Sequence, residues 1–463
     1  AYLGPRVVAR LRTQLTFSQL AVVGLFAALF ARAAHQPAQN DTWWQLRAGQ
    51  DIWHGLYPTT ERWTFTAHGR YWPDHEWLSQ AIFYALHTAG GMPLLTLFTA
   101  AVVTAAFAVG WVLMGGSTRR RLLLFVATVP ATLITSAGRP QVLSVLLLLV
   151  VVWLIQEQRF KPVPLVFLLW ANLHGQVVLG GVVLVAALVT AALSERRATR
   201  PLVIATALSG LATFVTPLGP KIVTLLWANT GQLDIEEWRP AWENGVAGLL
   251  LAIVAIAFFV ATWQLWRHNQ LEWSNRSVVA AGVALLPLAI RYGRILPTFM
   301  FVALVVIARA WEVVRPSSPR ADEPAMINTA LAAAFVMGAI LWTLFSWQQD
   351  DPALAWHPLP SQAVAAARQC DGPLYNRFDD GGYLAYFAQD IPYFVDGRVD
   401  PFPKSFLTDQ FRSEGSGDYE ATFAKWGITC ALLPPESPTA QHLLADHWRT
   451  TYADGDWLVL QRP

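Results

Sequence analysis

Charge is what this sequence has least of. Only 14% of its 463 residues are charged and 54% are hydrophobic, whereas a soluble domain carries roughly 25% charged residues. A purely soluble protein of this length is therefore excluded. The net charge of +2 gives no field that would attract nucleic acid, so no nucleic acid partner is expected. The two cysteines, in neither a CxxC nor a CxxH spacing, exclude a disulfide-rich scaffold.

Long apolar runs and aromatic residues are abundant instead. The 22 tryptophans and 24 phenylalanines are typical of the aromatic belts at membrane interfaces. Runs of roughly 20 apolar residues, the length that crosses a bilayer, predict a polytopic α-helical membrane protein with eleven spans. The mixed polarity of 76–91 indicates an interfacial amphipathic helix. The spans are expected at 17–34, 93–115, 121–137, 141–156, 162–174, 176–193, 201–218, 246–266, 277–291, 295–311 and 326–347.

The arginines predict the orientation of these spans. Clusters such as Arg119–Arg121 and 196–200 occupy every second connection. By the positive-inside rule the N-terminus is cytoplasmic. An odd number of spans then places the C-terminus outside. The chain is therefore expected in a membrane, with the lipid bilayer as its first partner.

Two domains are expected along the chain. Residues 1–347 form the transmembrane domain, with a long first external loop over 35–92. Residues 348–463 regain charge, Gly and Pro, and their alternating strand and helix patterns predict a C-terminal extracytoplasmic α/β domain. Strands are expected in GPLYNRF, PYFVDGR, TCALLPP and WLVLQRP, with helices in GGYLAYFAQ, 404–426 and TAQHLLADHW.

Both cysteines, Cys370 and Cys430, lie in this tail. An oxidising compartment permits a disulfide between them. The sequence leaves open whether their Cα atoms are close enough for the bond.

The first external loop concentrates polar residues. Five of the ten histidines lie between residues 35 and 87, and acids including Asp41, Asp74 and Glu76 alternate there with tryptophans. Acids beside aromatic ring faces are typical of sugar sites. The alternative is that the rings lie at the membrane interface and the acids are solvated. Asp41 is the strongest candidate for a functional residue. A carboxylate close to the end of a membrane span costs free energy, so its presence there indicates a role.

A metal ion is a second interpretation of this loop. The spacings between His68, His75 and His87 match no helical pair of ligands, so a transition metal is disfavoured. A divalent cation (Mg or Mn), held by carboxylates such as Asp41 and by a substrate phosphate, is the more plausible cofactor.

Polar residues also lie at the predicted outer ends of the spans. Arginine binds phosphate through two parallel hydrogen bonds, so arginines there suit the phosphate of a lipid-linked substrate. The alternative for each arginine alone is ordinary snorkelling. The candidate phosphate-binding residues are Arg139, Arg291 and Arg294, and the candidate substrate-binding residues are Asn172, His174, Glu236 and Glu237.

One motif resembles a known family. Asp41-Thr42-Trp43-Trp44-Gln45-Leu46-Arg47 is similar to the Asp-Pro, two aromatics, two residues, Arg pattern of oligosaccharyltransferases, with Thr42 in place of proline. The chain thereby resembles the GT-C integral-membrane glycosyltransferases, which also include protein O-mannosyltransferases and aminoarabinose transferases. It looks most like bacterial GT-C proteins with HEW, NLHG and DGR signatures, here at 75–77, 172–175 and 396–398.

The resemblance implies an inverting glycosyltransferase. It would move a sugar from a polyprenyl-phosphate donor to a glycan, lipid or protein acceptor at the outer face of the bacterial inner (plasma) membrane. Asp41 is implied as general base or metal ligand, with Asp74, His75 and Glu76 as base partners or cation ligands. Trp43, Trp44 and Arg47 are implied in substrate binding.

A non-catalytic role is the alternative. The chain would then be a GT-C-like subunit or lipid-binding partner of a larger membrane complex. Thr42 in the motif, and the lack of an acidic pair at 174–176, favour this alternative. A transporter is disfavoured, because the span interiors are nearly free of ionisable groups.

Overall fold

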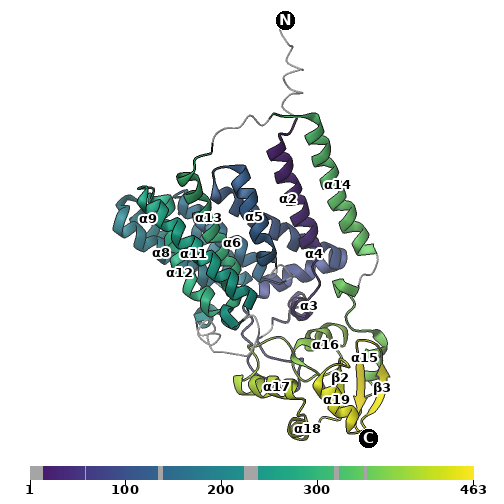
Figure 1. The fold of residues 1–463 in the computed structure, drawn as a ribbon. Coiled ribbons are helices and arrows are strands. Elements are labelled where there is room, and N and C mark those ends of the chain that lie inside the picture. Colours follow the sequence, from purple (N-terminus) through teal and green to yellow (C-terminus); the bar gives the residue numbers. More distant parts are fainter. Residues whose placement is uncertain are drawn as a thin grey trace. The chain divides into compact units, whose positions relative to one another are not determined.

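The computed structural model describes residues 14–57, 59–133, 139–223, 238–243, 245–317, 323–348 and 352–463. It is predominantly helical (Figure 1). The chain divides into two compact units. The first unit is Ala1–Gln36, Thr96–Thr216 and Glu237–Asp351, and the second unit is Pro37–Leu95, Pro217–Glu236 and Pro352–Pro463. The grouping adds most of the first loop to the tail, and the predicted domain boundary after residue 347 stays a prediction.

The first unit is a set of apolar helices. Within the described residues, seven helices are long and apolar enough to cross a membrane, and α6 and α7 are shorter apolar helices. The chain is therefore a multi-pass membrane protein, while the count of eleven spans stays a prediction. The helices are α2 (Phe17–Ala34), the part of α4 (Trp77–Met114) that begins at Thr96, α5 (Thr118–Leu133), α6 (Gln141–Gln156), α7 (Val163–Leu173), α8 (Val177–Ser194), α9 (Arg196–Ala212), α11 (Gly245–Arg267), α12 (Trp273–Arg291), α13 (Leu296–Val314) and α14 (Met326–Gln348).

The position of each helix within the first unit depends on how apolar its faces are. Helix α13 is apolar on nearly all faces and is buried along most of its length, as expected of a central helix. Helices α2 and α14 lie side by side (Figure 1), and Trp347 Nε1 of α14 donates a hydrogen bond of 3.2 Å to the carbonyl of Ala34.

Helix α4 joins two segments that were predicted separately. The amphipathic segment at 76–91 and the span at 93–115 are both helical, but they are continuous across a kink at Gly90 and Gly91. Gly91 has φ +65°, a conformation that glycine adopts without steric cost. A further helix, α3 (Asn40–Trp53), was not predicted within the first loop.

The second unit contains a four-stranded sheet in the order β1-β2-β4-β3. Strand β1 is parallel to β2, and the other pairs are antiparallel. Alternate residues of β2 and β4 enter two different hydrophobic clusters, so both sheet faces are covered. The strands are β1 (Leu374–Tyr375), β2 (Cys430–Leu433), β3 (Arg449–Ala453) and β4 (Leu458–Gln461), and the tail helices are α15 (Ser361–Ala367), α16 (Gly381–Phe387), α17 (Lys404–Ser416), α18 (Glu420–Trp426) and α19 (Pro438–Ala445).

Most tail elements match their sequence patterns. Strands occur in GPLYNRF, TCALLPP and WLVLQRP, and helices occur in all three predicted helical stretches, with 404–426 divided into α17 and α18. The strand predicted in PYFVDGR was wrong, because only Tyr393 there forms isolated bridges. Strand β3 was missed because it is an exposed edge strand with little apolar patterning.

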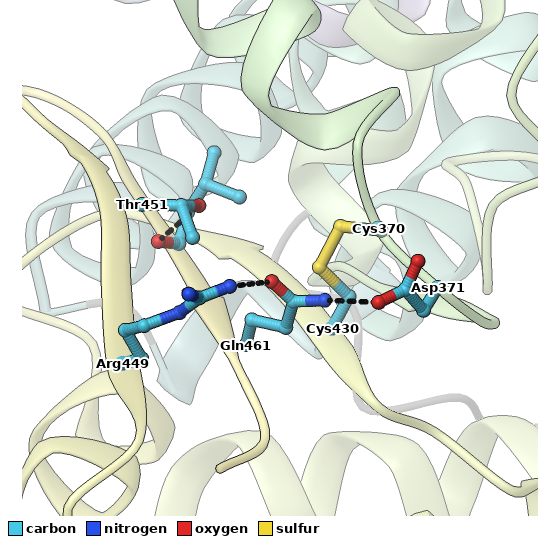
Figure 2. The surroundings of a disulfide bond; sticks show 7 residues. Cys370, Asp371, Cys430, Arg449, Thr451 and Gln461 are labelled. Carbon is cyan, nitrogen blue, oxygen red and sulfur yellow. Dashed lines mark hydrogen bonds between the residues drawn. A yellow bond between two sulfur atoms is a disulfide. The ribbon is translucent and has the colours of Figure 1, made fainter.

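The pairing of the two cysteines is settled by the fold. Cys370 follows α15 and forms a disulfide with Cys430 of β2, with 5.9 Å between the Cα atoms. Figure 2 shows Gln461 beside this bond, where it accepts a hydrogen bond from Arg449 and donates one to Asp371. The bond therefore attaches the end of α15 to a central strand of the sheet.

Candidate functional site

Asp41 lies in the first turn of α3, and the start of this helix contacts two segments of the tail. The indole Nε1 of Trp44 donates a 3.0 Å hydrogen bond to Asp41 Oδ1. The neighbouring Asn40 Oδ1 accepts a 2.5 Å hydrogen bond from the Gly382 amide. A Cβ atom on Gly397 would lie 2.6 Å from Asp41 Oδ1, so only glycine permits this approach. The start of α3 thus contacts the tail at Gly382 and at the DGR signature.

Asp74, His75 and Glu76 form a second polar group in the same unit. Asp74 Oδ1 accepts hydrogen bonds from Gln80 Nε2, at 2.9 Å, and from the Glu76 amide, at 3.1 Å. Burial raises the pKa of Asp74 to about 7 despite these hydrogen bonds. Asp74 therefore titrates near neutral pH, as candidate acid–base groups do.

His75 lies between two carboxylates. Its Nε2 is 3.6 Å from Glu76 Oε1, and its Nδ1 is 3.5 Å from Asp400 Oδ2. Burial lowers the pKa of His75, but the Asp400 and Glu76 carboxylates outweigh burial and raise the pKa to about 9. His75 is therefore a cation at neutral pH.

Two sets of contacts link Asp74, His75 and Glu76 to the region around Asp41. Gln45, one turn further along α3, donates from its side-chain amide to the Glu76 carboxylate. The segment 397–400 touches Asp41 at Gly397 and His75 at Asp400. The four predicted catalytic residues therefore lie in one neighbourhood of the second unit.

A buried ionic cluster lies beside this neighbourhood. Arg398, only 3% exposed, places Nη1 2.5 Å from Glu61 Oε2 and Nη2 2.6 Å from Asp396 Oδ2. Its guanidinium lies 3.9 Å from the ring centre of Trp63 and 4.3 Å from that of Trp72, within cation–π range. The sequence marked DGR as a signature but gave no signal that Glu61 is its partner, because 337 residues separate Glu61 from Arg398.

The first-loop residues predicted to bind substrate are packed or paired. Trp43 is 1% exposed and packs against Tyr386 and Phe387, with ring centres 5.3 and 4.6 Å away. Arg47 forms a 3.4 Å ion pair with Asp51 and contacts the Gln389 side chain. Substrate contacts by Trp43, Trp44 and Arg47 stay predictions.

The predicted phosphate-binding arginines belong to the first unit. Arg291 ends α12 with its guanidinium 4.9 Å from the ring centre of Tyr292, and its Nη1 is buried without a hydrogen-bond partner. Arg294 lies 4.9 Å from the ring centre of Trp238. Gln141 Nε2, two residues after Arg139, donates a 3.2 Å hydrogen bond to the Arg294 carbonyl. Segments carrying all three arginines therefore meet, and an anion would satisfy the Arg291 donor.

Asn172 and His174 are held at the end of α7. Asn172 Nδ2 donates to the carbonyls of Leu168 and Val215, at 2.8 and 2.9 Å. Ser144 Oγ accepts from Trp170 Nε1 and lies 2.7 Å from His174 Nδ1. These bonds fix the break between α7 and α8, and substrate contact by either residue stays a prediction. Glu236 and Glu237 lie outside the described residues.

A metal ion bound by the protein alone needs several ligand side chains close together. Within the described ranges, no group of three histidine, cysteine, aspartate or glutamate side chains is placed to hold a metal ion. Asp41 and the other described residues therefore do not form a site of three protein ligands, and a divalent cation held by carboxylates and a substrate phosphate stays a prediction.

Comparison with known proteins gives fold-level matches. No protein-family model and no curated protein matches the sequence. The archaeal oligosaccharyltransferase AglB from Archaeoglobus fulgidus, in complex with an inhibitory peptide and a dolichol-phosphate, matches with TM-score 0.59 and 12% identity over 90% of this chain and 69% of AglB. ArnT from Cupriavidus metallidurans, bound to undecaprenyl phosphate, matches with TM-score 0.52 and 14% identity over 96% of this chain and 97% of ArnT.

Both similar structures are GT-C glycosyltransferases. The chain therefore has the GT-C membrane glycosyltransferase fold, and the resemblance predicted from the Asp41 motif is confirmed at the level of the fold.

Proposed function

We propose that this protein is a membrane glycosyltransferase that uses a polyprenyl-phosphate sugar and acts at the outer face of the bacterial inner membrane. The observation that carries the proposal is Asp41, seated against DGR on a GT-C fold. AglB in complex with a dolichol-phosphate and ArnT bound to undecaprenyl phosphate support a lipid phosphate as the donor carrier.

The donor phosphate is assigned to the arginines of the first unit. Arg291 has a buried, unpartnered Nη1, and Arg294 shares its short connection between α12 and α13. Guanidinium groups stabilise the charge that develops on a leaving phosphate. Arg139 is the third contact, because its segment meets the Arg294 backbone through Gln141.

The acceptor side is assigned to Asp41. Its carboxylate takes the proton from an acceptor hydroxyl while the hydroxyl oxygen bonds to the anomeric carbon. The bond between that carbon and the phosphate oxygen breaks, and its electron pair leaves with the lipid phosphate. In-line attack inverts the anomeric centre and needs no enzyme nucleophile. Trp44, which donates to Asp41, orients the carboxylate.

The orientation is part of the proposal. A disulfide between Cys370 and Cys430 supports a tail in an oxidising compartment, as the arginine distribution predicts. Labelling of single introduced cysteines in intact cells tests this. A membrane-impermeant thiol reagent should reach exposed position 416 and should not reach exposed position 317. The reverse labelling would overturn the orientation.

The experiment for donor binding uses undecaprenyl phosphate as the probe on the purified full chain. Arg291→Ala should weaken binding by about tenfold or more, because a charge-assisted hydrogen bond contributes about 1.5 to 3 kcal/mol. Arg276→Ala, at the opposite end of α12, is the matched control and should bind normally. Equal binding by both variants would remove the phosphate assignment.

The experiment for transfer uses the chain reconstituted in liposomes with a panel of polyprenyl-phosphate sugars. Asp41→Asn should lower the rate at least about 10²-fold, the lower range for loss of a general base. Asp409→Asn, exposed on α17, is the control. Full transfer by Asp41→Asn would refute the base assignment. Lipid phosphate binding without transfer of any sugar by the wild type would favour the non-catalytic GT-C-like subunit.

A further inference from the structure

Asp400 is an acidic residue that the sequence patterns did not single out. It stands two residues after Arg398, whose guanidinium is fixed by Glu61 and Asp396 and lies against Trp63 and Trp72. Asp400 Oδ2 lies 3.5 Å from His75 Nδ1, and the two side chains are only 13% and 19% exposed. The ion pairs of Arg398 therefore fix the segment that carries Asp400, and Asp400 lies next to His75.

The two carboxylates beside His75 favour the protonated form of its ring. Both ring nitrogens face carboxylates: Nδ1 faces Asp400, and Nε2 faces Glu76 at 3.6 Å. Two carboxylates within 4 Å of one imidazole ring favour its charged form, so the geometry favours an imidazolium at His75. Asp74 is the third charged group acting on the ring, and Gln45 holds Glu76 from α3.

We propose that Asp400 is a positioning residue of the proposed active site, which anchors Nδ1 of His75 while Glu76 anchors Nε2. The role of Asp400 in catalysis rests on the proposed function. Its contact with His75 does not depend on that function. His75 is thereby a fixed cation and not a base. The base role falls to Asp41, which touches the same 397–400 segment through Gly397. The fixed cation contributes an electrostatic term to the binding of anionic substrate groups.

The electrostatics of the cluster agree with this geometry. Burial alone would lower the pKa of His75, but Asp400, Glu76 and Asp74 together raise it to about 9. The imidazolium therefore persists through neutral pH, and removing Asp400 should let it lose its proton earlier.

The test follows the His75 ring directly, without a substrate. The full chain is labelled with ¹³C-histidine in detergent micelles, and His75 is assigned among the ten histidines by His75→Gln. In the wild type, His75 should titrate near pH 9. In Asp400→Asn its pKa should fall by about one pH unit or more, the size expected for loss of a neighbouring opposite charge. Asp400→Glu should restore part of the shift.

Controls separate positioning from misfolding. Asp409→Asn, which removes an exposed carboxylate of α17, should leave the His75 titration unchanged. The other histidine signals and the thermal unfolding of Asp400→Asn should match the wild type. A wild-type His75 that titrates near 6.5, or an unchanged titration in Asp400→Asn, would overturn the proposal. Retention of transfer by Asp41→Asn would instead refute the proposed function and leave the Asp400 anchor standing.

Discussion

The two units of the chain bury different kinds of polar groups. Among the described residues, the buried side chains that carry formal charge all belong to the second unit, whereas buried polar residues of the first unit such as Ser144 and Asn172 are uncharged. An isolated charge among apolar helices costs several kcal/mol, and hydrogen-bonded neutral groups avoid that cost. The buried charged residues are Glu61, Asp74, Asp380, Asp396 and Arg398.

This difference shows where the charged groups of each unit lie. In the second unit, ion pairs join the first loop to the tail and bring Asp41 and His75 to the 397–400 segment. In the first unit, the arginines predicted to bind phosphate stand at helix ends, as Arg291 does. The second unit therefore buries ion pairs beside its two hydrophobic clusters, whereas arginines of the first unit such as Arg291 and Arg309 stay partly exposed.

Loss of the Arg398 charge should have the largest effect. Arg398→Met leaves Glu61 and Asp396 buried without a cation, which should lower the free energy of unfolding by about 3 to 5 kcal/mol. Thermal unfolding and limited proteolysis of the tail measure this. Arg412→Met, at an exposed pair on α17, should leave unfolding unchanged.

A triple variant sharpens this comparison. Glu61→Gln and Asp396→Asn added to Arg398→Met remove all three charges, so much of the lost stability should return. If Arg398→Met alone unfolds like the wild type, ion pairing does not organise the second unit.

Loss of the disulfide should have the next largest effect. Replacing Cys370 and Cys430 by serine and alanine opens a link across 60 residues of chain, which should cost about 2 to 4 kcal/mol in the second unit. Only the unfolding transition of that unit should move, because both cysteines lie in it. Intact mass after alkylation, with and without reduction, verifies the bond. Alkylation of both thiols without reductant would contradict it.

The sequence predicted structure correctly where the determining residues lie close together in the chain. Apolar runs located the helices of the first unit, and short apolar segments with turn residues at their ends located β2 and β4. The Asp41 motif pointed to the GT-C fold because its residues are contiguous. Contacts between distant segments could not be predicted: Glu61 with Arg398, and Asp400 with His75, depend on how the tail folds against the first loop. Helix α3 was missed because its buried face includes polar residues such as Thr42 and Gln45.

The pH dependence of the second unit should show a smaller effect. Burial raises the pKa of Glu414 to about 7, against the hydrogen bonds from the Phe378 amide and Gln410. A raised carboxyl pKa stabilises the fold below the ordinary value of 4.5, and this stability is lost as pH rises through about 7. Between pH 5 and pH 7 the loss should be on the order of 2 kcal/mol.

Unfolding of Glu414→Gln across this pH range measures the effect. The amide cannot ionise, so the variant should lose less stability than the wild type as pH rises. Glu420→Gln, exposed on α18, should follow the wild type. Parallel pH curves for wild type and Glu414→Gln would show that Glu414 does not titrate in this range.

The smallest effect should come from the neutral network of the first unit. Ser144→Ala removes the acceptor for Trp170 Nε1 and the hydroxyl beside His174 Nδ1. Hydrogen bonds between membrane helices average about 0.6 kcal/mol and reach about 1.7, so the loss should stay below about 2 kcal/mol. Denaturant titration of the chain in detergent measures it, with Ser194→Ala as the control, because the exposed Ser194 hydroxyl donates only to the Thr190 carbonyl of its own helix α8. A loss as large as that of Arg398→Met would mean that hydrogen bonds hold α6 against α7 as strongly as ion pairs hold the second unit. The proposed contrast between the two units would then fail.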